Sequence, residues 1–482
     1  MSRTKIVATY GPACTKERTI GSMLRGGLDV MRLNLSHLDP DNLAETVTRL
    51  RRIAAEASVP LAILADMPGP KIRCTVCEPQ SFTLKEGDRV TLSSRKVAST
   101  PTEIAIAYPH LIEDVKAGHE LAINDGLVLL RVEKVHTKEE VLHCVVLTGG
   151  EISSRKGVSF PHSTLRISSL TTRDRKGLRA AAQAEVDFVA LSFVRSADDI
   201  AAARRILGRA GRSDMPLVAK IETRQAVERI SEIVEASHAV MVARGDMGIE
   251  RPFDQVPLLQ KDIIACCNRA GKPVITATQM VESMITSSRP TRAEVSDVAN
   301  AILDGTDAVM LSAETAVGCN PGRVVRTMAQ IASTAETRID HQQALRIQRP
   351  GGVELALNDS LARAACQLAL DARLDALVCF SSSGQTAQRI ARYRPTCPVY
   401  VLTPNEQQCR RLALTWGLDV FQIPRPKLTQ SRKIVPVAQL VEPAVRTLLG
   451  QNRLKKGHRI AMLAGRLLGK PGGTNRLEVV EI

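Results

Sequence analysis

The sequence contains few aromatic residues, and this scarcity restricts the functions that the chain can have. Phe, Trp and Tyr make up 2% of its 482 residues, so its hydrophobic cores must be mainly aliphatic. Proteins that bind single-stranded nucleic acids usually stack the bases on aromatic side chains. The formal net charge is +15, but the arginines are spread along the chain without a long basic run. We therefore expect no nucleic-acid partner.

The sequence also lacks an apolar run long enough to span a bilayer. Its first residues, MSRTKIVATY, enter a strand pattern directly and contain no apolar signal segment or cleavage site. These features predict a cytoplasmic protein without a membrane partner. A chain of 482 residues suggests roughly three domains.

Short β-rich segments alternate with helical stretches along most of the chain. Such alternation predicts βαβ units and a parallel sheet, and a closed (β/α)8 barrel needs eight strands. The eight segments are Ile6–Thr9, Val30–Leu33, Leu61–Ala65, Phe188–Phe193, Leu217–Glu222, Ala239–Arg244, Pro273–Thr278 and Ala308–Ser312. We therefore expect an α/β protein built on a TIM barrel.

Two further regions interrupt and follow the predicted barrel. About 120 residues separate the third and fourth strands, far more than a normal βα loop, and their alternating pattern predicts an inserted all-β lid domain. After a linker predicted at residues 348–352, the pattern changes to an open α/β domain. The predicted division is barrel, 1–69; lid, 70–165; barrel, 166–347; C-terminal α/β domain, 353–482.

Polar side chains follow the predicted strands, at the end of a TIM barrel where enzymes carry their chemistry. Lys220 and Glu222 share one face of the fifth segment, and Asp246 follows the sixth. Mg²⁺ is commonly held by one or two carboxylates together with substrate phosphates. Any one such residue could be a cap or a turn, but together they favour phosphoryl transfer.

A serine-rich segment follows the first predicted strand of the C-terminal domain. It consists of Ser381, Ser382, Ser383, Gly384, Gln385 and Thr386 and precedes a helical run. Hydroxyls and backbone amides at a helix N-terminus can bind an anion, although a plain serine-rich cap is the alternative. We favour a phosphate-binding effector site.

Several segments, in a fixed order, carry a family resemblance. They include TKIVATYGPAC, DVMRLNLSH, ADMPGPKIR, VAKIETRQAV, VMVARGDMGIE and SSSGQTAQRIARYRP. On these segments the chain resembles pyruvate kinase along nearly its whole length. The resemblance implies a barrel with a β lid and a regulatory C-terminal domain, usually as a homotetramer. It also implies the glycolytic transfer of a phosphoryl group from phosphoenolpyruvate to ADP, giving pyruvate and ATP.

The resemblance assigns roles to residues at the barrel rim. Glu222 and Asp246 would ligate Mg²⁺ or Mn²⁺, and a second Mg²⁺ would arrive with ADP. Lys220 would stabilise the transferring phosphoryl group and the enolate, and Arg32 would hold the phosphoryl oxygens. These roles combine positioning with electrostatic stabilisation.

The resemblance also implies which residues bind the substrate carboxylate and the nucleotide. The amides of Gly245 and Asp246, with the Thr278 hydroxyl, would bind the carboxylate, and Thr278 lies where the enolate is protonated. The nucleotide-binding residues would be Asn34, His37, Arg73 and Lys156. Arg73 could instead be a salt-bridged rim residue and Lys156 a solvated lid charge, with Arg155 able to take its place.

The segment ADMPGPKIR departs from the potassium-dependent members of the family. Met67 replaces a threonine that helps to ligate K⁺, and Lys71 replaces a glutamate near that site. The predicted monovalent-cation region consists of Asn34, Ser36, Asp66 and Lys71. A tethered ammonium can replace a bound cation electrostatically, so we expect that K⁺ is not required.

The C-terminal stretch GRLLGKPGGTNRL contains Arg466 and Lys470, which could meet a second phosphate of a sugar-phosphate or AMP effector. A catalytically silent metabolite sensor on the same scaffold is an alternative function. It is disfavoured because the residues expected at an active rim are all present. A third possibility, a mutase or dikinase fragment that acts on phosphoenolpyruvate, conflicts with the β insertion and with Arg73 and Lys156.

Overall fold

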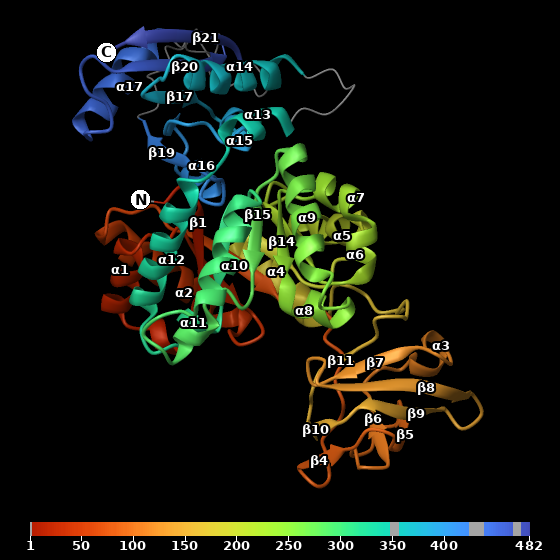
Figure 1. Cartoon of the computed structure of the whole chain (residues 1–482). Helices are drawn as coiled ribbons and strands as arrows, with labels where there is room; N and C mark the ends of the chain where they lie inside the picture. The colour runs from red at the N-terminus through yellow and green to blue at the C-terminus, as the bar shows by residue number, and fades with distance from the viewer. Residues whose placement is uncertain (1, 348–355, 424–437, 466–473) are drawn as a thin grey trace.

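The structure is a computed structural model that describes residues 2–347, 356–423, 438–465 and 474–482 (Figure 1). The linker predicted at residues 348–352 and the predicted effector residues Arg466 and Lys470 lie outside these ranges. In the described ranges, no helix has both the length and the apolar character needed to cross a membrane.

Eight parallel strands close into a barrel, which confirms the TIM-barrel prediction. Their order around the barrel is β1-β16-β15-β14-β13-β12-β3-β2. Their bounds are β1 (Lys5–Thr9), β2 (Val30–Asn34), β3 (Ala62–Met67), β12 (Phe188–Leu191), β13 (Leu217–Ile221), β14 (Ala239–Ala243), β15 (Val274–Ala277) and β16 (Ala308–Leu311). Each strand overlaps one of the predicted segments.

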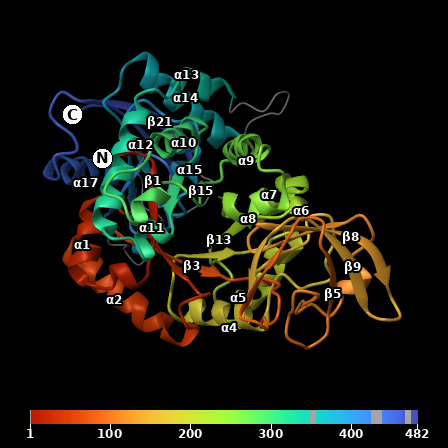
Figure 2. The ribbon, with the colours of Figure 1, turned by 60° about the horizontal axis from the view of Figure 1, so that its bottom comes forward.

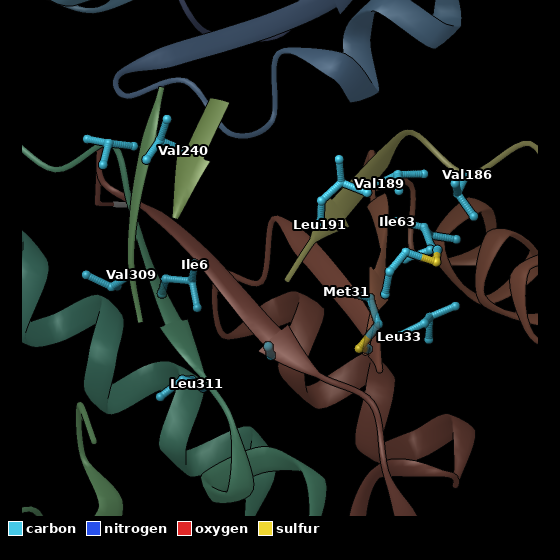
Figure 3. Packing of buried hydrophobic residues seen from close by; sticks show 14 of the residues in the cluster. Ile6, Met31, Leu33, Ile63, Val186, Val189, Leu191, Val240, Val309 and Leu311 are labelled. Atoms are coloured by element: carbon cyan, nitrogen blue, oxygen red, sulfur yellow. The ribbon is translucent and has the colours of Figure 1, made fainter. Parts of the chain in front are cut away.

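The barrel strands are apolar on both faces, because one face fills the interior and the other supports the surrounding helices. Val7 pairs with Val30 in the interior layer. On the outer face, Ile6 pairs with Val309 and Met31 with Ile63, and Figure 3 shows this layer. The main covering helices are α1 (Glu17–Arg25), α2 (Leu43–Glu56), α4 (Thr172–Gln183), α5 (Ala197–Arg209), α7 (Ile230–Ala236), α9 (Val256–Ala270), α10 (Arg292–Leu303) and α12 (Pro321–Glu336).

The insertion between β3 and β12 is rich in β-structure, as predicted. Six strands form one sheet in the order β11-β7-β8-β9-β5-β6, and β10 pairs with β4. Their bounds are β4 (Ser81–Leu84), β5 (Arg89–Ser93), β6 (Glu103–Ala105), β7 (Glu120–Ile123), β8 (Val128–His136), β9 (Val141–Thr148), β10 (Gly150–Ser153) and β11 (Val158–Ser159). The limits at residues 70 and 165 remain a prediction.

In its described ranges, the C-terminal domain contains an open five-stranded sheet in the order β19-β18-β17-β20-β21, and only β21 runs antiparallel among these strands. The strands are β17 (Ala376–Phe380), β18 (Val399–Thr403), β19 (Leu418–Gln422), β20 (Arg459–Gly465) and β21 (Thr474–Glu481). The helices are α13 (His341–Ile347), α14 (Leu357–Asp371), α15 (Gln385–Arg392), α16 (Glu406–Arg411) and α17 (Ala438–Gly450). This domain and the lid lie at opposite ends of the barrel (Figures 1 and 2).

Candidate active site

Three buried charged residues and the largely buried Arg32 meet at the C-terminal ends of β2, β3 and β13. Lys220 Nζ lies 2.8 Å from Glu222 Oε1 and 3.6 Å from Asp66 Oδ1. Arg32 Nε lies 2.7 Å from Asp66 Oδ2. We call Arg32, Asp66, Lys220 and Glu222 the rim cluster. The structure thus brings three of the predicted catalytic and metal-binding residues together around Asp66.

Neighbouring groups fix the orientation of the rim cluster. Lys220 Nζ donates to Ser192 Oγ at 2.6 Å, and Arg32 Nη1 donates to Thr9 Oγ1 at 3.0 Å. The backbone N–H of Phe193 donates to Glu222 Oε2 at 2.7 Å. The sequence analysis did not assign Thr9 a role, although its place at the end of the first strand was a usable signal.

Two oxygens of the rim cluster are buried without a hydrogen bond. Within the described residues, Asp66 Oδ1 and Glu222 Oε1 have no partner of good hydrogen-bond geometry, and each forms an ion pair with the Lys220 ammonium, at 3.6 and 2.8 Å. Buried polar atoms are normally satisfied. Burial raises the pKa of Glu222, the ammonium of Lys220 opposes this, and Asp246 adds to it. A divalent cation beside Glu222 and Asp246 would bind the Glu222 oxygen that lacks a hydrogen bond. It would also neutralise the repulsion between the two carboxylates.

The charge of Lys220 is secured by its carboxylate neighbours. Burial alone would lower the pKa of the ammonium, but Asp66 and Glu222 outweigh burial and raise it. Lys220 is therefore a fixed positive charge in a dry site. Such a preorganised charge stabilises anionic groups more strongly than a solvated one does.

Thr278 lies in a strained turn beside the first residues of α8 (Arg244–Glu250). Its φ is 73° and that of Gln279 is 53°, and a β-branched residue rarely adopts the left-handed region. The Thr278 hydroxyl accepts the Gly245 N–H at 2.9 Å. Arg244 Nη2 donates to the Thr278 carbonyl at 2.6 Å and so holds the turn. Strain that is held in this way is common at functional sites.

A cleft of about 770 Å³, including its open mouth, lies between the lid and the barrel. Asp246 and Glu250 of α8 line its barrel side, and Gly157 and Phe160 line its lid side. We call it the lid cleft. Burial, together with Asp246 and Glu222, raises the pKa of Glu250 to about 7, although Arg224 opposes the shift. The sequence analysis missed Glu250; its position one helical turn after Asp246 was the available signal.

The ion pair that the structure gives Lys71 is with a residue outside the predicted monovalent-cation region of Asn34, Ser36 and Asp66. Lys71 Nζ is 3.4 Å from Asp125 Oδ1 in the lid. The side chain runs beside Gly157, where an added Cβ would lie 2.8 Å from Lys71 Cε. The Asp66 carboxylate is already enclosed by the two cations of the rim cluster. The contact that the structure gives Lys71 is therefore with Asp125 of the lid and not with Asp66 of the barrel.

The four predicted nucleotide residues form two local groups. Arg73 Nη1 donates to the Arg155 carbonyl at 2.8 Å, which places it against the turn that carries Lys156. On the loop after β2, the His37 N–H donates to the Asn34 carbonyl at 3.1 Å. The first group belongs to the lid and the second to the barrel rim.

The predicted effector segment joins β17 to α15. Ser381 Oγ accepts the Gly384 N–H at 2.9 Å, and the Thr386 hydroxyl is hydrogen-bonded to the Thr474 hydroxyl. Gly384 has a φ of 80°, a conformation that favours glycine. Ser382 and Ser383 remain partly exposed. The segment therefore forms a compact turn with two of its hydroxyls already engaged.

Comparison with known proteins covers both main parts of the chain. Residues 1–325 match the family model "Pyruvate kinase, barrel domain", and residues 359–480 match "Pyruvate kinase, alpha/beta domain". A pyruvate kinase from Geobacillus stearothermophilus is 40% identical over 477 residues, covering 99% of this chain and 80% of the relative. Pyruvate kinase 2 from Synechocystis is 40% identical over 479 residues, covering 99% and 79%. A Staphylococcus aureus pyruvate kinase is 38% identical over 480 residues, covering 99% and 80%.

Proposed function

Because the chain belongs to the pyruvate kinase family, a family of transferases, we propose that its lid cleft carries out the reaction of that family. The phosphoryl group of phosphoenolpyruvate passes to ADP, and the products are pyruvate and ATP. The observation that supports the proposal is the rim cluster, with its two fixed cations and with two buried carboxylate oxygens that lack a hydrogen bond of good geometry within the described residues.

Lys220 and Arg32 act on the transferring group. Phosphoryl transfer has a loose transition state with charge spread over the phosphoryl oxygens, so catalysis is largely positioning and electrostatics. Lys220 is held by Ser192, Asp66 and Glu222 and can orient one N–H toward the phosphoryl and enolate oxygens. Arg32 Nε and Nη1 bind Asp66 and Thr9, whereas its Nη2 has no hydrogen-bond partner among the described residues and can meet the substrate.

Glu222 and Asp246 are the residues that would hold the divalent cation, Mg²⁺ or Mn²⁺. The buried, unsatisfied Glu222 Oε1 fits this role, as does the mutual repulsion between the two carboxylates. When bound, the ion supplies positive charge that neutralises the phosphoryl and enolate oxygens. Phe193 orients Glu222 by its N–H, which keeps one oxygen directed away from the backbone.

The carboxylate of the substrate is bound by the turn that carries Thr278. The Gly245 N–H donates to the Thr278 hydroxyl, which in turn donates to the Ala277 carbonyl at 2.6 Å. Each donor would exchange its present acceptor for an oxygen of the carboxylate, beside the Asp246 amide. Arg244 keeps the turn in place during this exchange, since it also pairs with Asp297 at 2.7 Å.

The nucleotide binds from the lid side of the cleft. Arg73 and Lys156 supply positive charge for the phosphates of ADP, with Asn34 and His37 on the opposite rim. A second Mg²⁺ accompanies the nucleotide. Closing the lid over the cleft would exclude water from the transfer.

Activity does not require K⁺ under this proposal. Lys71 and Asp246 line the same lid cleft, so a tethered ammonium contributes charge there, although from the lid side and not from beside Asp66. Turnover measured in tetramethylammonium buffer is expected to stay unchanged when KCl is added. A several-fold rise on addition of KCl would refute K⁺ independence and leave the main function standing.

The remaining parts of the proposal concern regulation and assembly. A phosphorylated metabolite, a sugar phosphate or AMP, would bind the segment from Ser381 to Thr386 and regulate activity. The enzyme would act in the cytoplasm as a homotetramer, in which effector binding at one site can bias another. Light scattering on the purified chain would give the oligomeric state.

A coupled assay tests the function directly. Purified chain, phosphoenolpyruvate, ADP and Mg²⁺ are expected to yield pyruvate, and omission of ADP or Mg²⁺ should abolish it. A folded protein that makes no pyruvate under these conditions would support the alternative, a catalytically silent metabolite sensor. The complete set of rim residues favours the enzyme.

A further inference from the structure

Three potential metal ligands gather at the turn that joins β8 to β9 in the lid. His136 ends β8, Glu139 lies in the turn, and His143 is the third residue of β9. We call these three residues the hairpin triad. None of them lines the lid cleft, and the turn lies at the outer edge of the lid, away from the barrel (Figures 1 and 2). The hairpin triad is therefore separate from the reaction proposed above.

The pairing of the two strands brings the histidines together. β8 and β9 are antiparallel, and His136 pairs with Val141, so His143 is its diagonal neighbour on β9. Diagonal neighbours across antiparallel strands are within reach of ring side chains. The imidazole rings of His136 and His143 accordingly lie 4.6 Å apart between their centroids, with an interplanar angle of 88°.

The turn holds Glu139 beside the two histidines. Arg95, whose Nη1 is paired with Glu103 at 3.7 Å, donates from Nη2 to the Glu139 carbonyl at 2.9 Å. One nitrogen of each imidazole and one carboxylate oxygen of Glu139 all lie within 4.8 Å of one another. In the part of the chain that the structure describes, no other group of three histidine, cysteine or acidic residues has its ligand atoms this close.

The ligand atoms of the hairpin triad are not engaged elsewhere. Across the described ranges, the two imidazoles and the glutamate carboxylate form no hydrogen bond or ion pair. None of the three residues is buried, so an ion can reach them from solvent. Two lysines are near: Lys134 pairs with His143 across the strands, and Lys138 lies in the turn. Both are exposed, so their ammonium groups can turn toward water.

Two imidazoles and one carboxylate form a donor set that suits transition metals. Zn²⁺ bound by two histidines and one glutamate keeps its fourth position for water. Imidazole also suits copper, nickel and iron, whereas Mg²⁺ and Ca²⁺ prefer oxygen ligands. Bonds of about 2.0–2.2 Å in a tetrahedral site place the donor atoms about 3.4 Å apart. The side chains of the triad therefore need to close by at most about 1.4 Å, from 4.8 Å to about 3.4 Å.

We propose that the hairpin triad binds one divalent transition-metal ion, with Zn²⁺ as the representative of this class. The ion joins the end of β8, the turn and β9 through three bonds. A ligand that binds the folded hairpin more tightly than the unfolded chain stabilises the fold. The bound metal therefore fixes the outer end of the β8–β9 hairpin.

Isothermal titration calorimetry with Zn²⁺ on the full chain tests the proposal. The buffer contains excess Mg²⁺, which occupies the site proposed at Glu222 and Asp246, and a pH of about 7.5 keeps most imidazoles neutral. Wild type is expected to bind Zn²⁺. His143→Gln should weaken that binding by about tenfold or more, since even the loss of a second-shell partner costs about 10–100-fold. His110→Gln is the matched control: His110 is another exposed histidine of the lid, and its variant should bind like wild type.

A second pair of variants separates coordination from general attraction to an acidic turn. Glu139→Gln and Glu140→Gln each remove one negative charge from the same turn, but only Glu139 belongs to the hairpin triad. Glu139→Gln should weaken Zn²⁺ binding clearly, and Glu140→Gln should change it little. Circular dichroism checks the fold of every variant.

Three results would overturn the proposal: no Zn²⁺ binding by wild type, wild-type affinity in folded His143→Gln, or equal weakening by Glu139→Gln and Glu140→Gln. Zn²⁺ held only by cysteines or by the rim cluster would give the second result, because His143→Gln leaves those groups intact. The titration needs no turnover. A chain that binds Zn²⁺ as expected but makes no pyruvate would therefore refute the proposed function and leave the hairpin triad assignment intact.

Discussion

Buried carboxylates at the two ends of the barrel differ in how completely they are hydrogen-bonded. At the strand starts, Asp187 accepts hydrogen bonds from Arg51 and the Ile63 N–H on Oδ2, and from Arg410 on Oδ1. At the strand ends, Asp66 and Glu222 are equally buried, yet each keeps one oxygen without a hydrogen bond to the described residues. Complete pairing indicates a structural role, and incomplete pairing indicates a place for a ligand.

Asp307, a second buried aspartate at the strand starts, also has both carboxylate oxygens hydrogen-bonded. Asp307 Oδ1 accepts from Arg394 at 2.9 Å and from the Trp416 N–H at 3.2 Å, and Oδ2 accepts from the Val274 N–H at 3.0 Å. Arg394 and Trp416 belong to the C-terminal part of the chain. Asp187 and Asp307 therefore fasten the C-terminal domain to the barrel, whereas the charges of the rim cluster stay available for substrate.

The largest expected effect is a difference in kcat between substitutions of two buried lysines, Lys220 at the strand ends and Lys5 at the strand starts. Lys220→Met should lower kcat by roughly 10³-fold, since a preorganised charge on the reacting group is lost. Lys5 donates to the Leu418 carbonyl at 2.9 Å and lies 3.6 Å from Asp29. Lys5→Met should cost roughly 2 kcal/mol of stability and leave kcat per folded molecule near that of wild type.

Steady-state kinetics and urea unfolding of both lysine variants make the comparison. If Lys5→Met lost as much kcat as Lys220→Met while remaining folded, the division between structural charges at the strand starts and reactive charges at the strand ends would be wrong. Circular dichroism of Lys220→Met is the necessary control for its fold.

The next effect concerns the attachment of the C-terminal domain. Arg394→Met leaves the buried Asp307 carboxylate without its cation. Breaking a buried pair in this way typically costs about 3–5 kcal/mol, so the midpoint of urea unfolding should fall clearly. Unchanged stability would mean that the ion pair between Arg394 and Asp307 does not fasten the C-terminal domain to the barrel.

The pH dependence of stability should reflect His238, the residue that directly precedes β14 at the strand starts. Burial, with help from Arg204 and Lys272, lowers the pKa of His238 to about 4. The unfolded chain gains a proton on this residue near its ordinary pKa of about 6.5, whereas the folded chain does so only near pH 4. This contribution to stability is therefore full above about pH 6.5 and falls as the pH drops toward 4, by up to roughly 3 kcal/mol.

His238→Gln should flatten that part of the stability profile, because glutamine does not titrate. Thermal unfolding of wild type and variant between about pH 7.5 and about pH 4.5 covers most of this range and measures the difference. Parallel profiles for the two proteins would show that His238 is not the titrating group.

The smallest effect is expected on the surface. Arg446 Nη2 lies 2.8 Å from Glu442 Oε1, but the side chains are 80% and 82% exposed. Exposed pairs of this kind contribute about 0–1 kcal/mol. Arg446→Gln should therefore unfold at nearly the same urea concentration as wild type. A large shift would contradict the claim that buried ion pairs stabilise this protein much more than exposed ones do.

The fold and the rim could be predicted from the sequence because both depend on local pattern. Apolar segments at βα spacing indicated the eight strands, and polar residues after them marked the rim, including Lys220 and Glu222. The ion pair of Lys71 with Asp125 could not be predicted, because Asp125 reaches Lys71 only through the packing of the lid. The raised pKa of Glu250 was missed for the same reason, because it arises where segments distant in sequence meet.

The most direct test of this account is a Mg²⁺ titration of wild type and Glu222→Gln in the coupled pyruvate assay. The substitution keeps the size of the side chain but removes the anionic oxygen that has no hydrogen bond among the described residues. We expect wild type to form pyruvate at a rate that saturates with Mg²⁺, and a folded Glu222→Gln to stay nearly inactive at every concentration. Equal turnover of the two proteins, or turnover of wild type in EDTA, would contradict the assignment of the rim as a divalent-cation site for phosphoryl transfer.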